Sequence, residues 1–461
     1  MRNWVHTVAA LTLIHGTVLA DDPALKAQLD AVFGHPDFSR AVWACAVTDV
    51  ETGGVLYERR ADEAVIPASN QKLYVAAAAW LRQGPDHRAF TEYWGRGAVR
   101  DGVLDGDLIL RGYGAFCVSA HFPRSRPVPE RERALQAQLD AVVSRLRAAG
   151  VGEVRGRVLF DRSRWTDMPS NTHYRAADAL LFHDNTLDIL VTNGAVRCCP
   201  SSLVSFRVEV AAGLGKQQRT LFEGRPTDTL RIDPFASGED YWRLEAADPC
   251  AYYSSQVQAA LEQRGLHVTG AQVTAAPDQE RLLFRLPGLS LRELLPSMLS
   301  HSDNLRAEMV LLNLGYGVYG RANYANGTRA VMEVLGAAGV THGEYRAADG
   351  CGLSIDNRVT CRDTVRLLAM MAVQPDGAVF RSSMAVSGTS GTLEKRLTAE
   401  GVKGRVQGKS GTLASVAALS GYAQTGSGRM LCFSFICNRI PDAERCWKGM
   451  EEALGLLCRA P

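Results

Sequence analysis

Three short motifs stand in a fixed order along this chain, and they constrain its fold more than any other feature of the sequence. A lysine follows a serine by three residues at Ser69 and Lys72, a Ser-Asp-Asn tripeptide begins at Ser302, and a Lys-Ser-Gly-Thr run begins at Lys409. The Ala-rich run after Lys72 predicts a helix, and residues three apart on a helix share a face. We therefore expect Lys72 to lie beside Ser69, in a fold that brings the two later motifs to the same place.

These residue types point to one kind of chemistry. A serine hydroxyl is a poor nucleophile and needs a base beside it. A lysine is a base only when it is neutral, and burial, the positive end of a helix and a second cation each lower its pKa. Lys409 is the natural second cation. The backbone N–H groups of Ser69 and Thr412 fit an oxyanion hole, so the motifs indicate acyl transfer through a serine ester.

Each motif also has a plainer interpretation. Lys72 and Lys409 could be solvated surface charges, but lysine is scarce in a chain that uses arginine freely. The lysines are Lys26, Lys72, Lys216, Lys395, Lys403, Lys409 and Lys448. Arginine does not deprotonate in proteins, so a base requires lysine. The Ser-Asp-Asn motif is also a good helix N-cap, which is compatible with a turn that presents Ser302 and Asn304 to a cleft.

With these motifs the chain resembles the D-alanyl-D-alanine carboxypeptidases of the penicillin-binding protein 4 type, a serine family with the S-x-x-K, S-D-N and K-T-G set. The interval between the first two motifs, 302 − 69 = 233 residues, is similar to that family and much longer than in class A β-lactamases. The resemblance covers nearly the whole chain after residue 20. Further matching segments are Gly106–Leu110, Leu180–Asn185, Asp349–Ser354 and Gly391–Arg396.

The resemblance implies a catalytic role for three residues. Ser69 would be the acylated nucleophile, Lys72 its general base, and Ser302 the relay that carries a proton to the leaving D-alanine. The implied activity is that of a serine-type D-Ala-D-Ala carboxypeptidase, with D,D-endopeptidase activity as an extension. The substrates would be peptidoglycan stem peptides, β-lactams would be covalent inhibitors, and neither a cofactor nor a metal is expected.

The resemblance also implies five substrate-binding residues. Asn304 would hold a peptide amide, and Lys409 with Ser410 and Thr412 would receive the terminal carboxylate. An acidic residue of the inserted domain would meet the amine of the peptide side chain, and Asp161 is the candidate. An ordinary turn aspartate is the alternative for Asp161.

Two departures from the family pattern bear on the site. Lys-Thr-Gly is Lys-Ser-Gly here, which keeps a hydroxyl at Ser410. The family's Asp-Gly-Ser-Gly-Leu-Ser has Cys351 in place of its first serine, so we expect Cys351 to border the cleft.

Two other functions compete with the carboxypeptidase. The first is a β-lactamase or related serine esterase. The Glu-x-x-Leu-Asn motif of class A β-lactamases is not found, and the nearest candidate, Glu308 to Asn313, has the wrong spacing. The second is a non-catalytic peptidoglycan-binding protein, which would have no need of both Ser69 and Lys72.

The expected fold is α/β, a transpeptidase/β-lactamase-like domain in which helices flank an antiparallel sheet, with one or two nested inserted domains. We expect the transpeptidase-like domain to be built from residues 21–90 and 290–461, and residues 91–289 to be inserted. Within the insert, residues 91–170 and 265–289 would form a second domain, with residues 171–264 nested in it as a third. Local patterns predict helices over 23–33, 135–149, 291–299, 304–314 and 444–457, and strands over 41–50, 54–59, 404–407, 415–423 and 430–438.

Residues 1–20 have the pattern of a signal peptide: a basic start, a short apolar run, and small residues before Asp21. We therefore expect a protein that is periplasmic or otherwise exported after cleavage of the signal peptide, with no transmembrane anchor in the mature chain; a buried N-terminal helix is the alternative. The formal net charge of +2 argues against a nucleic-acid-binding function. The 11 cysteines show no metal-binding spacing, and their odd number leaves at least one thiol unpaired within a monomer.

Overall fold

The computed structural model describes residues 22–116, 128–166, 177–192, 195–200, 207–210, 229–232, 239–271, 280–342, 344–440 and 442–461. The expected signal peptide lies outside the described residues. Among the described residues, no helix combines the length and apolar character needed to cross a membrane.

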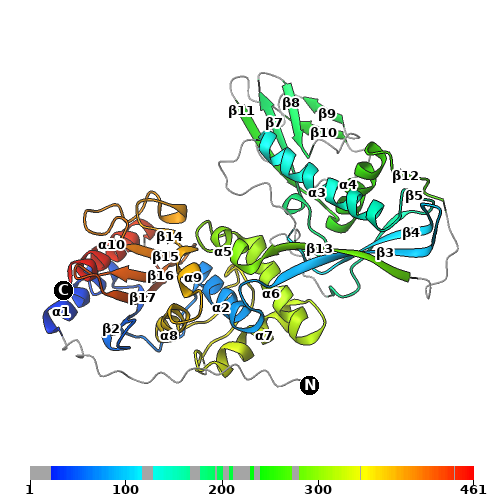
Figure 1. The fold of residues 1–461 in the computed structure, drawn as a ribbon. Coiled ribbons are helices and arrows are strands. Elements are labelled where there is room, and N and C mark those ends of the chain that lie inside the picture. Colours follow the sequence, from blue (N-terminus) through cyan, green and yellow to red (C-terminus); the bar gives the residue numbers. More distant parts are fainter. Residues whose placement is uncertain are drawn as a thin grey trace.

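The core of the molecule is a six-stranded antiparallel sheet (Figure 1). In spatial order its strands are β14 (Ala385–Val386), β15 (Val406–Leu413), β16 (Val416–Gln424), β17 (Met430–Asn438), β1 (Val42–Asp49) and β2 (Val55–Arg59). The pairing of β1 with β17 joins Val42 to Asn438 and Asp49 to Leu431. Strands from both ends of the described chain therefore lie side by side in one sheet.

Both faces of this sheet are buried, because successive side chains of a strand point to opposite faces. From β1, Trp43, Cys45 and Val47 pack into one apolar cluster, and Ala44 and Ala46 pack into the other. The first cluster lies under α1 (Pro23–Phe33) and α10 (Ala443–Arg459). The small alanines on the second face let the helices that carry the motifs approach closely.

The second face carries a layer of helices (Figure 1). They are α2 (Gln71–Gln83), α5 (Leu291–Leu299), α6 (Asn304–Tyr319), α7 (Tyr324–Ala337), α8 (Cys361–Ala372) and α9 (Gly377–Ser382). Helix α2 is buried over ten consecutive residues, Gln71 to Trp80, because α5, α6, α7 and α8 surround it and the sheet lies beneath. The Ala-rich sequence of α2 suits such a central helix.

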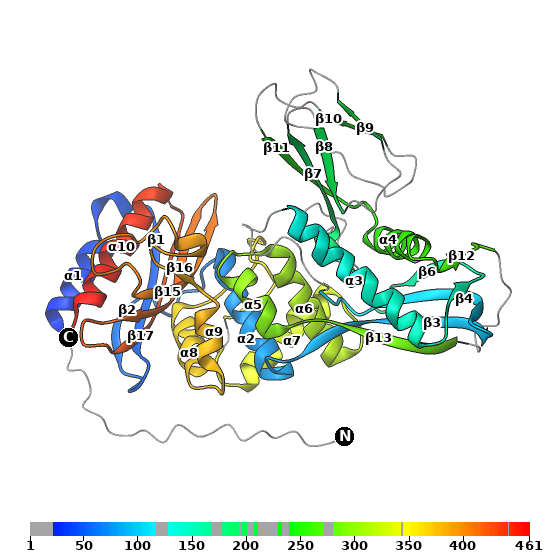
Figure 2. The same ribbon diagram turned by 45° about the horizontal axis from the view of Figure 1, so that its top comes forward.

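A second lobe extends from this layer on the long strands β3 and β4 (Figure 2). Its six-stranded sheet contains β12 (His267–Val268), β5 (Glu153–Val154), β4 (Val103–Gly112), β3 (Arg88–Arg100) and β13 (Glu280–Ser290), with β6 (Val158–Asp161) paired to β4. Helix α3 (Val128–Ala148) packs against α4 (Pro249–Gln263), and α4 packs against β6. This lobe contacts the helical layer where Ala322 N–H donates to the Arg164 carbonyl at 2.9 Å.

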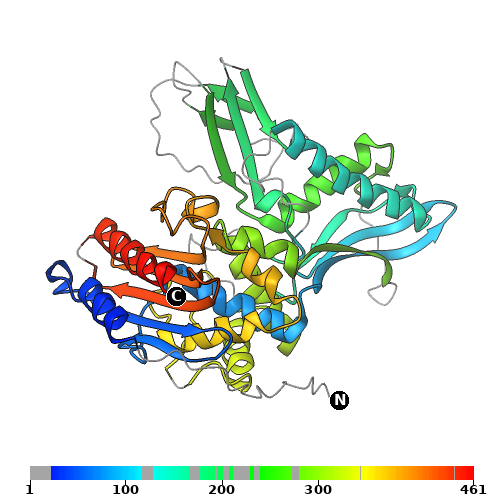
Figure 3. The same ribbon diagram turned by 60° about the vertical axis from the view of Figure 1, so that its left-hand side comes forward.

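Two smaller sheets form a further layer beyond α3 and α4 (Figure 3). One has the order β11 (Glu239–Glu245), β7 (Thr186–Thr192), β8 (Ala195–Cys199), and the other pairs β9 (Arg207–Val210) with β10 (Thr229–Ile232). The predicted domain boundaries stay a prediction. Helix α4 belongs to the predicted third domain by residue number, yet it packs on the second sheet.

The helices predicted over 23–33 and 291–299 are confirmed with the same bounds. The helix predicted over 304–314 continues to Tyr319, because Gly320 in the left-handed conformation ends it there. The helix predicted over 135–149 begins earlier than expected, at Val128, and ends at Ala148. Helices α7 and α8 and most strands of the insert were not predicted.

Candidate active site

Ser69 lies in a tight turn directly before α2. The 3₁₀ turn Ala68–Asn70 leads into the helix, and Ala68 has a φ of 48°, a conformation that costs a non-glycine residue free energy. The turn is held from two sides. A Cβ at Gly352 would lie 1.9 Å from the Ala68 carbonyl oxygen, and a Cβ at Gly411 would lie 2.9 Å from the Ser69 nitrogen. Only glycine fits these two positions, and Ser69 is thereby fixed between the 349–354 loop and β15.

Lys72 is fully buried and points at three oxygen atoms. Its Nζ lies 3.0 Å from Ser69 Oγ, 2.8 Å from Asn304 Oδ1 and 2.6 Å from the carbonyl oxygen of Cys351. The pKa of Lys72 is lowered, mainly because burial penalises the ammonium form, and the nearby acidic groups only partly oppose this. The first expected relationship, Lys72 beside Ser69, is thus present in the structure.

These three contacts can also be made by a neutral lysine. A neutral amine has two N–H donors and one lone pair. The donors fit Asn304 Oδ1 and the Cys351 carbonyl, and the lone pair then accepts the Ser69 O–H. Among the described residues, no carboxylate lies in ion-pair contact with Nζ of Lys72. The arrangement is that of a base ready to take the hydroxyl proton.

The Ser-Asp-Asn motif forms the turn before α6. Ser302 has a φ of 60°, and the Asp303 side chain caps α6 by accepting from the Arg306 N–H at 2.9 Å. The helix cap and the proposed catalytic role therefore coexist, since Asn304 reaches Lys72 from the first residue of α6. The capped turn places Ser302 toward β15.

Lys409 is the second buried amine. Its Nζ lies 2.9 Å from Ser302 Oγ and 2.5 Å from the carbonyl oxygen of Ser410. Its pKa lies well below its usual range, first because of burial and second because of the charge of Lys72. Two buried amines, each near a serine hydroxyl, therefore lie in one site.

Ser410 and Thr412 lie on the open edge of β15. Val406 exchanges hydrogen bonds with Ser387 on the β14 side, and backbone groups alternate sides along a strand, so Ser410 and Thr412 face this same side. Among the described residues, strand β14 pairs with β15 only at Gln407 and Gly408. Strand β14 therefore does not cover the same edge of β15 from Lys409 to Leu413. The N–H of Thr412 is thereby directed away from β16, as an oxyanion hole with the Ser69 N–H requires.

Asp161 is not brought to these residues. It lies at the end of β6, where its carboxylate pairs with Arg111 at 2.6 Å and accepts from Ser163 N–H at 2.8 Å. It lines a pocket of about 420 Å³ with residues that follow α6, namely Gly320 and Arg321. Asn304 begins this 16-residue helix, which is about 24 Å long at about 1.5 Å per residue. Burial raises the pKa of Asp161, but hydrogen bonds from Ser163 and the ion pair with Arg111 together hold it below its usual value. The predicted role of Asp161 stays a prediction, and the structure gives it a partner elsewhere.

Three groups at the site were not singled out from the sequence. Thr392 Oγ1 lies 2.7 Å from Ser410 Oγ, and its segment had been noted only as part of the family resemblance. The carbonyl of Cys351 contacts Lys72, while its thiol is fully buried, so Cys351 borders the site by its backbone. Glu308 lies behind that carbonyl and is also buried.

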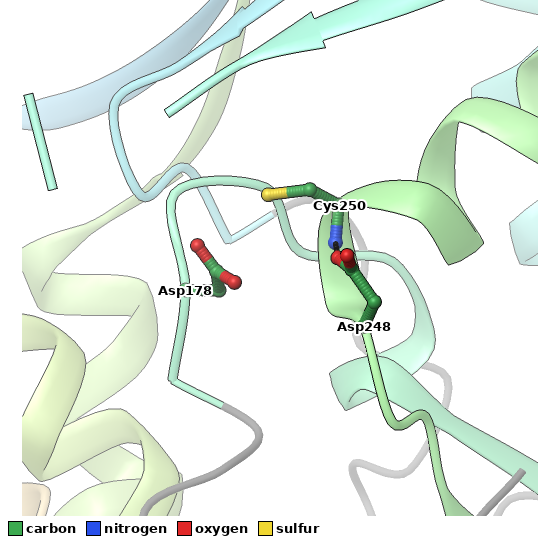
Figure 4. Close-up of side chains that lie close together, drawn as sticks. All are labelled: Asp178, Asp248 and Cys250. Carbon is green, nitrogen blue, oxygen red and sulfur yellow. Dashed lines mark hydrogen bonds between the residues drawn. The ribbon is translucent and has the colours of Figure 1, made fainter. Parts of the chain in front are cut away.

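Two groups of acidic and thiol side chains lie close enough together to share a cation. The first is Glu308, Asp349 and Cys351, and the second is Asp178, Asp248 and Cys250 at the start of α4 (Figure 4). In the second group Arg162 pairs with both carboxylates at 2.9 Å, so a guanidinium already neutralises them. Neither group therefore carries the assignment of a metal site.

Comparison with known proteins agrees with this geometry. The model of the D-Ala-D-Ala carboxypeptidase 3 (S13) family matches residues 25–195 and 234–455. A D-alanyl-D-alanine carboxypeptidase of Actinomadura is 29% identical over 94% of this chain and 86% of its own length. The D-alanyl-D-alanine carboxypeptidase DacB of Haemophilus influenzae is 24% identical over 80% of this chain and 79% of its own length.

The fold has solved counterparts. The crystal structure of penicillin-binding protein 4 from Haemophilus influenzae superposes with a TM-score of 0.71 at 20% identity, covering 92% of this chain and 97% of that one. The same protein complexed with a β-lactam gives a TM-score of 0.69 at 21% identity, covering 90% and 95%. The expected transpeptidase/β-lactamase-like fold is therefore confirmed. Since the family model matches well over half of its residues, this chain belongs to the D-Ala-D-Ala carboxypeptidase 3 (S13) family.

Proposed function

We propose that this D-alanyl-D-alanine carboxypeptidase cuts the D-Ala-D-Ala end of peptidoglycan stem peptides through an ester on Ser69. The observation that carries the proposal is the 3.0 Å contact between Lys72 Nζ and Ser69 Oγ inside a buried site. The contact of Lys409 Nζ with Ser302 Oγ at 2.9 Å supports the same mechanism.

Acylation begins when the Ser69 O–H proton passes to neutral Lys72 and Oγ attacks the carbonyl carbon of the penultimate D-alanine. The carbonyl oxygen becomes negative between the N–H groups of Ser69 and Thr412. Preorganised donors of this kind each contribute about 3 kcal/mol to the transition state. The C–N bond then breaks, and the proton held by Lys72 passes through the Ser302 hydroxyl to the leaving amine of D-alanine, which makes Lys72 neutral again for the next step.

The terminal carboxylate of the substrate binds at the open edge of β15. Lys409 supplies a nearby amine, and the hydroxyls of Ser410 and Thr392 lie 2.7 Å apart at this edge. Asn304 shares its oxygen with Lys72 and has its amide nitrogen left for a backbone carbonyl of the peptide. Water finally attacks the ester carbonyl, Lys72 takes its proton, and that proton returns to Ser69 as the peptide leaves.

The test uses the full-length protein with a penicillin and with a peptide ending in D-Ala-D-Ala. Intact mass spectrometry is expected to find one penicilloyl group per chain on wild type and none on Ser69→Ala. Release of D-alanine is expected from wild type alone. A Ser69→Ala protein that still forms the adduct, or a wild type that forms none, rejects the proposal. Rapid turnover of the penicillin adduct favours the β-lactamase alternative.

We also propose that the protein is exported to the periplasm. As an extension of the chemistry above, we propose endopeptidase activity. The signal-peptide pattern of residues 1–20 supports export, and N-terminal sequencing of the protein from the cell envelope tests it. Endopeptidase cleavage uses the same acyl-enzyme with a larger leaving amine. Incubation with cross-linked dimeric muropeptides tests it, because only an endopeptidase converts them to monomers.

A further inference from the structure

Glu308 is a buried carboxylate that the proposed chemistry does not use. It lies on α6, is 1% exposed, and accepts two consecutive backbone amides of the 349–354 loop. Its Oε1 lies 2.7 Å from Cys351 N, and its Oε2 lies 3.1 Å from Gly350 N. One carboxylate thus accepts hydrogen bonds from the N–H groups of two consecutive residues.

The loop that Glu308 grips supplies an acceptor to the base. The carbonyl oxygen of Cys351 lies 2.6 Å from Lys72 Nζ and 3.4 Å from Ser69 Oγ. A shift of this carbonyl would remove one of the two acceptors that direct the Lys72 lone pair toward Ser69. The backbone of Cys351 therefore connects Glu308, through its N–H, to Lys72 and Ser69, through its carbonyl.

One face of α6 supports Lys72 twice. Asn304 and Glu308 are four residues apart, so they lie on the same face of the helix. Asn304 contacts Nζ directly, and Glu308 acts one peptide further away. The loop approaches α6 closely because residue 350 is glycine: a Cβ there would lie 2.6 Å from the Ala307 carbonyl oxygen.

Asp349 completes the loop from its other side. Its carboxylate accepts from Gly352 N at 2.7 Å and from Ser354 N at 2.6 Å, and Asn357 Nδ2 donates to it at 2.8 Å. The loop is therefore tied to itself by Asp349 and to α6 by Glu308. Gln71 Nε2 of α2 also donates to the Asp349 carbonyl at 3.3 Å, and the two Glu308 bonds hold the Gly350–Cys351 end of the loop against α6.

We propose that Glu308 is a positioning residue of this enzyme, which clamps the Gly350–Cys351 backbone so that the Cys351 carbonyl orients Lys72 toward Ser69, and whose charge sets how readily Lys72 loses its proton. The proposal rests on the proposed role of Lys72 as base.

The charged groups around the pair determine the sign of the effect. Lys72 is faced by Lys409 from β15, by Glu308 from α6, by Asp303 from the turn before α6, and by Asp349 and Cys351 from the loop. Glu308 is faced by Asp349 and Cys351. Burial, and secondly the charge of Asp349, raise the pKa of Glu308 to about 7. Negative charge on Glu308 raises the pKa of Lys72, so loss of that charge makes Lys72 a base at lower pH.

The experiment measures the rate of penicillin acylation of the full-length protein from pH 5 to 10. Glu308→Gln removes the charge and one of the two acceptors. Its plateau rate is expected to fall about 10- to 100-fold through misplacement of the carbonyl, and its acid limb to move to lower pH. Glu308→Asp keeps the charge but is too short to reach both amides, so its plateau falls while its acid limb stays in place.

Glu92→Gln is the matched control, a buried glutamate of β3 bonded to Trp94, Tyr113 and Arg285. Its profile should match wild type.

Separate outcomes test the two proposals. A wild type that forms no adduct on Ser69 rejects the proposed function. A wild type that acylates normally, with a Glu308→Gln limb at the wild-type pH, overturns the inference about Glu308 alone. If Glu308→Gln does not fold, as its thermal melt would reveal, Glu308→Asp still decides: a plateau rate equal to wild type overturns the inference.

Discussion

Gly411 of β15 lies so close to Ser69 that a single methyl group at position 411 would lie 2.9 Å from the Ser69 nitrogen. The contact joins β15 to the turn that carries the nucleophile. It also places the N–H of Ser69 next to the strand that bears Thr412. The oxyanion hole and the position of the nucleophile thus depend on the absence of one side chain.

Gly411→Ala is expected to slow penicillin acylation about 100-fold, because displacement of Ser69 by about 1 Å costs roughly that much. Stopped-flow acylation measures the rate. Gly336→Ala on α7 is the control, because its Cβ would meet no heavy atom within 4 Å. That variant should keep the wild-type rate. An unchanged rate in Gly411→Ala would mean that the turn can yield without loss of function.

Lys409 is expected to make the protein less stable as the pH falls from 10 toward 7. Its folded pKa lies well below the value in the unfolded chain, so the unfolded chain binds more protons in this window and is favoured by them. Lys409→Met removes the effect. Its free energy of unfolding, relative to wild type, should therefore improve on going from pH 10 to pH 7. Urea titrations at both pH values measure it, and a constant difference would contradict the lowered pKa of the buried Lys409.

Arg306 links the Ser-Asp-Asn turn to the inserted lobe. It is 1% exposed and contacts Asp303 at 2.9 Å and Asp184 at 3.5 Å. Asp184 lies in a turn of three left-handed residues, His183 to Asn185, with φ values of 51°, 53° and 56°. Such strain persists only where surrounding contacts enforce it.

Arg306→Met should destabilise the protein by about 3–5 kcal/mol, because it removes the buried guanidinium that pairs with the buried Asp184 and the partly buried Asp303. It should also lower the acylation rate through Asp303. Thermal melts and penicillin binding measure the two effects. Arg329→Met, which removes an exposed ion pair with Glu333, is the control and should leave the melting temperature within error. Equal melting temperatures for the two variants would rule out a structural role for Arg306.

Cys351→Ser is expected to keep the wild-type acylation rate within about threefold, because the site uses its backbone carbonyl and not its thiol. Burial also raises the pKa of the thiol well above its usual range. Iodoacetamide should therefore leave Cys351 unmodified in the native protein and modify it after denaturation, as peptide mass spectrometry would show. Rapid native labelling would contradict the buried position.

The sequence predicted the local parts of the site well. The spacing of Ser69 and Lys72 follows directly from helix periodicity, and the capping preference of Ser302–Asp303 correctly places the start of α6. Family resemblance placed Lys409 near them. The predictions for Ser69, Lys72 and the start of α6 each depend on residues within one short motif.

The rest depends on contacts between distant segments. Glu308 and Cys351 are too far apart in the sequence for a local pattern to predict their contact. The role of the Cys351 carbonyl could not be predicted either, because a backbone carbonyl is present whatever the side chain. Strand β15 was predicted too short, because Gly408 and Gly411 have low strand propensity while their neighbours on β16 hold them in the sheet. Asp161 shows the converse limit. The family resemblance suggested its role, which stays a prediction, and the ion pair with Arg111 is a contact that the resemblance did not predict.

The pairing of β1 with β17 has a consequence for when activity can appear. The strand that precedes the nucleophile is completed only by a strand synthesised nearly four hundred residues later. A nascent or C-terminally truncated chain therefore has Ser69 without the scaffold that activates it. We therefore expect catalysis to begin only after β17 has been synthesised and has paired with β1. An incomplete chain should not cut peptidoglycan.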